Sequence, residues 1–133
     1  MAGLVITVSH ADLTLLDYFA ISPDLRGQGL GHAVLPLIRD LVRKRRGGHF
    51  FLEIEMPPPV RSSDTPDDRD GQWMRRRAFY FSAGMVEIGM RAFVYDSYME
   101  LLAFPEDVSA ITFEGYGELL EATWPGGMKP ERI

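Results

Sequence analysis

The chain has 133 residues, of which 46% are hydrophobic and 25% are charged, a composition typical of one globular domain with its own core. It contains no cysteine, which excludes disulfide bonds, thiolate metal sites and a cysteine nucleophile. The formal net charge of −5 argues against a nucleic-acid-binding protein, which normally carries a basic surface. No apolar run approaches the roughly 18 residues of a membrane span, and the N-terminus lacks the pattern of a secretory signal. We therefore expect a cytoplasmic enzyme or binding domain.

The first half of the chain predicts two strands and a helix. A run of β-branched residues marks a strand over residues 4–8. The nearly all-apolar segment 13–21 is typical of a buried central strand. Apolar side chains then recur at helical spacing over residues 29–46. Pro36 lies inside this helix and is expected to kink it or to disturb its first turns.

A third strand is predicted over residues 50–56, where side chains alternate. Its period of two places Glu53 and Glu55 on one face, and Leu52 and Ile54 on the other. The elements expected after it are a loop over 57–70, a helix over 71–83, a hairpin of strands 86–94 and 98–104, and a weak helix over 108–123.

This order of elements predicts a mixed α/β (α+β) sheet flanked by helices. Strands 13–21 and 50–56 should run parallel, because a helix crosses over between them. We expect residues 1–104 to form the main domain. Residues 105–133 would be a C-terminal tail whose weak helix packs on that same domain.

A glycine-rich turn, Arg26-Gly27-Gln28-Gly29-Leu30-Gly31, joins the second strand to the helix. Such a turn is suited to hold phosphate, because the first helical N–H groups lack partners and glycine lets an anion approach the backbone. The P-loop pattern fails here, since His32 and Ala33 follow Gly31. The dinucleotide pattern fails as well, since His32 takes the place of its last glycine.

The spacing Arg-x-x-Gly-x-Gly, at Arg26, Gly29 and Gly31, resembles the pyrophosphate-binding motif of the GNAT superfamily of acyl-CoA N-acyltransferases. A second segment, Ala-Phe-Tyr-Phe-Ser-Ala-Gly-Met from Ala78 to Met85, is similar to that family's pattern of tyrosine, three residues, glycine and a large apolar residue. The two motifs occur in the family's order, and the resemblance covers residues 3–104.

The resemblance implies a GNAT-like fold and an acetyl-CoA-dependent N-acetyltransferase. The amine of a small molecule or a protein would attack the thioester directly, with acetyl-CoA as co-substrate and no metal. The cofactor-binding residues carried over from the family lie on the second strand and on the glycine-rich turn: Phe19, Ala20, Ile21, Arg26, Gly27, Gln28, Gly29, Leu30, Gly31 and His32.

The resemblance also implies candidate catalytic residues. Tyr80 stands where the family places a tyrosine that protonates the leaving thiolate; this role is favoured over the alternative of a core aromatic with a polar tip. Glu53 and Glu55 are candidates for the base, and Asp17 is a further one; each could instead be an ordinary paired or solvated acid. The run from Arg75 to Arg77 would open the later helix and either reach adenosine phosphates or form a solvated basic face.

The sequence departs from the family at its start and near Tyr80. A full GNAT domain begins with a strand, two helices and a strand before the segment seen here. Strand 4–8 would then be an exposed edge that pairs with a second subunit, which predicts a homodimer. Trp73 stands where the family often has asparagine. A non-catalytic acyl-CoA-binding sensor or a dimeric interaction module therefore stays open as the alternative.

Overall fold

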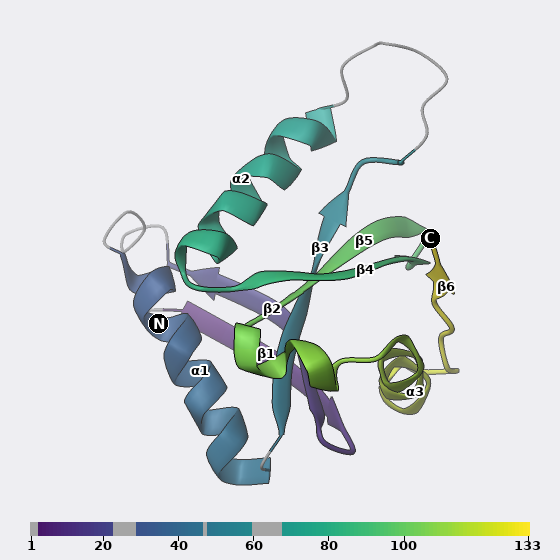
Figure 1. Cartoon of the computed structure of the whole chain (residues 1–133), viewed down its shortest axis with the longest axis horizontal. Helices are drawn as coiled ribbons and strands as arrows, with labels where there is room; N and C mark the ends of the chain where they lie inside the picture. Colours follow the sequence, from purple (N-terminus) through teal and green to yellow (C-terminus); the bar gives the residue numbers. More distant parts are fainter. Residues whose placement is uncertain (1–2, 23–28, 47, 60–67) are drawn as a thin grey trace.

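The computed structural model describes residues 3–22, 29–46, 48–59 and 68–133. Its elements follow the expected order, and Figure 1 shows them coloured along the chain. They are β1 (Gly3–His10), β2 (Leu13–Ile21), α1 (Leu30–Arg46), β3 (His49–Met56), α2 (Asp68–Ser82), β4 (Val86–Val94), β5 (Ser97–Ala103), the 3₁₀ helix η2 (Pro105–Ala110), α3 (Phe113–Thr123) and the short β6 (Glu131–Arg132).

The strands form one mixed sheet in the order β1-β2-β3-β5-β4-β6. β2 and β3 are parallel, as expected for strands joined by a crossover helix. All the other neighbours are antiparallel. The mixed α/β sheet predicted from the sequence is therefore confirmed, and β1 forms one of its edges.

The two faces of the sheet carry separate cores. One core contains buried residues of α1, such as Leu35 and Ile38, with Phe79 and Tyr80 of α2 packed against it. The other core lies under α3 and contains Tyr116 and Leu119. Figure 1 shows α1 and α2 on the left of the molecule and α3 on the right. Because the side chains of β3 alternate, Ile54 belongs to the first core and Phe51 to the second.

β2 and β3 pair over only half of their length. Four residue pairs join them, from Leu13 with His49 to Leu16 with Leu52. Beyond these pairs β3 continues to pair with β5, and β2 continues to pair with β1. Two parallel strands that stay in the sheet but no longer pair with each other must diverge, so the sheet opens between their carboxyl ends.

A β-bulge lies where this opening begins. Thr7 of β1 is opposite Leu16, whereas its neighbour Ile6 is opposite Tyr18, so Asp17 is the extra residue. A bulge re-aims the side chains that follow it and increases the local twist. Leu15 lies in the core under α3, whereas Phe19, four positions later on the same strand, packs against the core under α1 and α2.

Two elements differ from the sequence-based prediction by more than two residues. The helix predicted over 71–83 begins earlier, at Asp68, so the end of the predicted loop 57–70 was wrong; residues 60–67 of that loop lie outside the described part. The single weak helix predicted over 108–123 was also wrong. It is split into η2 and α3, because the Thr112 side chain accepts a hydrogen bond from the Gly115 amide and starts a new helix.

α1 continues through Pro36 as one α-helix. None of the helices among the described residues is both long enough and apolar enough to cross a membrane.

Candidate functional site

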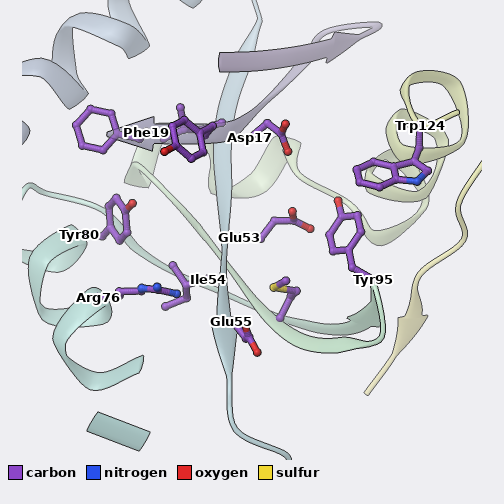
Figure 2. A pocket seen from close by; sticks show the side chains of 12 residues that line it. Asp17, Phe19, Glu53, Ile54, Glu55, Arg76, Tyr80, Tyr95 and Trp124 are labelled. Carbon is purple, nitrogen blue, oxygen red and sulfur yellow. The ribbon is translucent and has the colours of Figure 1, made fainter. Parts of the chain in front are cut away.

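A cavity of about 440 Å³ lies where β2 and β3 separate (Figure 2). Its wall includes residues from both faces of β3: Ile54 faces α1 and α2, whereas Glu53 and Glu55 face α3. Tyr80 and Arg76 of α2 line one end, and Tyr95 and Trp124 line the other. The cavity therefore borders side chains from both faces of the sheet at the point where β2 and β3 separate.

Glu53 is a largely buried carboxyl group with two tyrosine partners. The Tyr116 hydroxyl, itself fully buried, donates a hydrogen bond to Oε2 of Glu53, and Tyr95 provides a second side-chain hydrogen bond. Burial raises the pKa of Glu53 to about 7, the hydrogen bonds oppose this shift, and the nearby Asp17 adds to it. A carboxyl group with a pKa near neutrality is suited to accept and release a proton.

Tyr95 reaches Glu53 from a two-residue turn between β4 and β5. Tyr95 and Asp96 have positive φ angles of 55° and 57°, the pattern of a type I′ hairpin turn. Asparagine and glycine are preferred at such positions, and a bulky residue there is unusual. A tyrosine held in this unfavourable backbone conformation indicates that its hydroxyl has a role in the cavity.

Tyr80 lines the opposite end of the cavity, next to Phe79 and Arg76. Burial raises the pKa of Tyr80, and the neighbouring Arg76 charge partly offsets that shift. The hydroxyl thus stays protonated at neutral pH and can donate a hydrogen bond. Figure 2 shows Tyr80 and Glu53 on opposite sides of the β3 ribbon.

A buried ion pair anchors α2, and with it Tyr80, to the sheet. Glu100 of β5 is only 2% exposed and accepts hydrogen bonds from Arg77, at 2.7 and 3.0 Å, and from the Trp73 indole, at 3.1 Å. Arg77 also contacts Glu87. Trp73, which replaces the asparagine expected from the family, therefore has a structural role in this chain.

The arginine run is not at the start of a helix. The run from Arg75 to Arg77 lies in the middle of α2, because that helix begins at Asp68 and ends at Ser82. The expectation that they open the helix was wrong. Arg77 is occupied by Glu100 and Glu87, whereas Arg76 faces the cavity.

The predicted anion-binding turn is described only in part, because Arg26, Gly27 and Gln28 lie outside the described residues. Gly29 has a φ of +73°, which favours glycine at that position. A side chain at Gly31 would meet the Phe79 ring, with a Cβ only 2.5 Å from it. The backbone angle at Gly29 and the close packing at Gly31 each favour glycine for a structural reason, apart from any binding of an anion.

His32 and Leu30 lie in the first turn of α1. The Ser82 hydroxyl donates to the Phe79 carbonyl oxygen at 2.8 Å and also contacts Nε2 of His32. Because a hydroxyl has one proton, Nε2 of His32 must be the donor in that second contact. His32 thereby links α1 to α2 beside the predicted turn.

The carboxyl end of β2 contains Phe19, Ala20 and Ile21. It lies beyond the last residue of β2 that pairs with β3. Pairing between β2 and β3 stops at Leu16, so β3 forms no ladder with Phe19 or Ala20. An extended ligand with amide groups could pair there as an additional strand.

The structure brings Glu53, Glu55, Asp17 and Tyr80 of the predicted site around one cavity. Sequence reasoning missed Tyr95, Tyr116 and Trp124. Tyr95 is placed by a turn and the other two by the tail, so no local motif marks them. The tyrosine in a tight turn was a usable signal. Among the described residues, no three His, Asp or Glu side chains form a group that could hold a metal ion.

Several solved acetyltransferases are similar to this chain. The ribosomal-protein-S18-alanine N-acetyltransferase from Escherichia coli is 27% identical, over 79% of this chain and 61% of that one, with a TM-score of 0.52. A protein assigned to the GNAT acetyltransferase family, from Bacteroides thetaiotaomicron, is 19% identical over 92% and 65%, with a TM-score of 0.62. A Bacillus anthracis protein assigned as a streptothricin acetyltransferase, solved in complex with acetyl coenzyme A, is 13% identical over 77% and 54%, with a TM-score of 0.53.

No protein-family model matches the chain, and no curated protein sequence matches it. The chain spans only about 54% to 65% of the length of these three similar structures. What the similarity establishes is the fold. The GNAT-like mixed sheet expected from the two sequence motifs is confirmed.

Glu53 predicts a specific pH dependence of stability. Its pKa rises from 4.5 to about 7 on folding, so the folded protein binds the proton more tightly than the unfolded chain does. The stabilisation is complete below pH 4.5 and is lost as the pH rises to 7, an effect of about 3 kcal/mol. Glu53→Gln should remove this pH dependence in urea unfolding measured from pH 4 to 8.

The exposed Glu118, on the outer side of α3, provides the matched control. Glu118→Gln should leave the pH profile of the unfolding free energy unchanged. Tyr116→Phe should extend the Glu53-dependent loss to higher pH, because the Tyr116 hydrogen bond lowers the pKa of Glu53. Parallel profiles for wild type and Glu53→Gln would contradict this description of the buried carboxyl group.

Proposed function

Because the chain has the GNAT acetyltransferase fold, we propose that it transfers an acetyl group from acetyl-CoA to a primary amine of a small molecule or protein. The observation that carries the proposal is the cavity between the separating strands, which Glu53 borders on one side of β3 and Tyr80 on the other. Its position between separating parallel strands supports a reaction in which two substrates enter from opposite faces.

The pantetheine arm would bind along the edge of β2 that no longer pairs with β3. Phe19, Ala20 and Ile21 would offer backbone hydrogen-bonding groups to its amides, as a neighbouring strand does. The pyrophosphate would lie at the start of α1, from Gly29 to His32, where free amide groups and the helix dipole favour negative charge. Arg26, Gly27 and Gln28 belong to the same proposed turn.

When bound, acetyl-CoA supplies an activated acetyl thioester. Glu53 would accept the proton that the amine loses as its nitrogen bonds to the carbonyl carbon, either directly or through water. Tyr80 would donate a proton to the sulfur as the carbon–sulfur bond breaks. Solvent then returns a proton from Glu53 to Tyr80, so that no net charge is left on the protein. Glu55 would attract the amine to the cavity without taking part in proton transfer.

Glu53→Gln should lower kcat/KM for acetyl transfer by about a hundredfold or more, the usual range for losing a general base. In the wild-type protein, kcat/KM should decrease as the pH is lowered below 7, because Glu53 becomes protonated. The variant should not show this decrease. Release of the CoA thiol across a panel of primary amines, followed from pH 5.5 to 9, is the measurement. Tyr80→Phe should lower kcat while leaving acetyl-CoA binding intact.

Glu55→Gln is the control, since it removes a neighbouring charge from the same strand and cavity wall. It should change KM more than kcat. Tight acetyl-CoA binding with no thiol release for any amine would overturn the enzyme proposal and favour a non-catalytic binding module. Equal activity of Glu53→Gln and wild type would remove Glu53 from the mechanism.

We further propose that two copies of the chain associate through β1. Leu4, Val5 and Ile6 of this edge strand are about 40% exposed. Val5 also lines an apolar groove of about 680 Å³ with Leu37 and Leu41 of α1. Edge strands with exposed apolar residues tend to pair with another chain.

Val5→Lys should convert the dimer to a monomer, because it places a charge in the groove and at the edge. Ala122→Lys, on the exposed side of α3, adds the same charge away from β1 and should leave the dimer intact. Sedimentation equilibrium over a range of protein concentrations distinguishes the two. A wild-type protein that is monomeric at every concentration would contradict the proposal.

A further inference from the structure

The side of the cavity that faces α3 is acidic and aromatic. Asp17, Glu53 and Glu55 line it together with Tyr95 and Trp124, and Figure 2 shows them on the same side of the β3 ribbon. The one basic side chain among the residues that line the cavity is Arg76, at the opposite end beside Tyr80.

Two of these carboxylates have no counter-ion among the described residues. Neither Asp17, which is exposed, nor Glu55, which is half-buried, forms an ion pair within those ranges. The fully buried acids Glu100 and Asp107 are each paired with an arginine. Acids left unpaired at the wall of a cavity, beside a third acid, are held against their mutual repulsion and favour a cationic ligand.

An aromatic pair completes this side. The rings of Tyr95 and Trp124 contact each other with centroids 5.0 Å apart, and Trp124 remains 40% exposed. Trp124 follows the last turn of α3, where its amide is bonded to the Leu120 carbonyl oxygen. The indole ring is the aromatic surface that binds an ammonium group best. The protein thus offers both carboxylates and a π face at the same end of the cavity.

We propose that the acceptor is an aliphatic diamine or polyamine, whose second ammonium group binds on the acidic and aromatic side of the cavity, beside Asp17 and Trp124. The inference rests on the proposed acetyl transfer and extends it to the substrate class. The amine that reacts must be neutral, so it cannot itself be the lasting partner of these acids. A second ammonium group, which stays charged throughout, supplies the partner that Asp17 and Glu55 lack. Trp124 and Asp17 are thereby specificity residues, and Asp17 in addition raises the pKa of the proton-transfer residue Glu53.

The test compares 1,4-diaminobutane with n-butylamine, which has the same carbon chain and one amine fewer. Calorimetric titration of the protein with each amine, with and without CoA, should show at least about tenfold tighter binding of the diamine. Trp124→Leu and Asp17→Asn should each remove most of that difference. In acetyl transfer, Trp124→Leu should raise KM for the diamine about tenfold with little change in kcat. Asp17→Asn should raise KM likewise and should also move the Glu53 limb of the pH profile to lower pH, because the Asp17 charge raises the pKa of Glu53.

Glu118→Gln, which removes an exposed charge outside the cavity, is the control for Asp17→Asn. Equal affinity for the two amines would overturn the proposal, as would tighter binding of a short peptide with one free N-terminal amine. Because binding is measured without turnover, the two proposals fail separately. Selective diamine binding without acetyl transfer would contradict the enzyme assignment alone, and acetyl transfer that does not discriminate between the amines would contradict the substrate class alone.

Discussion

The structure depends on the separation of two parallel strands that share one sheet. β2 and β3 pair up to Leu16 and Leu52 and then diverge, and each keeps its other neighbour. The bulge at Asp17 supplies the twist that this divergence requires. An opening of this kind breaks the backbone hydrogen bonds of a central strand pair, which is costly unless a ligand or solvent replaces them. The cavity and its position in the fold both follow from this one local feature.

The second constraint is the burial of a carboxyl group in that opening. Glu53 faces the core under α3, and the hydroxyls of Tyr116 and Tyr95 satisfy it. These partners come from the tail and from a hairpin turn, so three distant segments must assemble before the carboxyl group reaches its environment. Burial favours the neutral form and the hydrogen bonds favour the charged form. Their balance places the pKa of Glu53 at about 7, where either form is accessible.

Sequence reasoning predicted the strands, the crossover helix and the parallel pairing well, because hydrophobic periodicity is a local signal. It also placed Glu53, Tyr80 and Asp17 among the candidates, and the structure brings them around one cavity. It could not identify Trp124 as part of that cavity, or Tyr116 as the buried donor to Glu53. Both follow Phe104, where no motif continues, and their positions depend on how α3 packs across the sheet.

The role expected for the three arginines was wrong because the start of their helix was misplaced. Placing the helix start at Gly71 put Arg75 to Arg77 near an open helix end. The helix begins at Asp68 instead, and Arg77 is held by Glu100 of β5. Arg77 is positioned by a partner on a strand that is distant in the sequence, and a local sequence pattern does not reveal such a partner.

If the opening between β2 and β3 is an acetyl-CoA site, calorimetric titration of the purified protein with acetyl-CoA should show micromolar binding with one site per chain. Gly31→Leu should weaken this binding, because its side chain would push Phe79 away from the start of α1. No binding to a protein that is folded by circular dichroism would contradict this prediction. The opening would then be a feature of the sheet alone, and the search for a ligand would move to its acidic side.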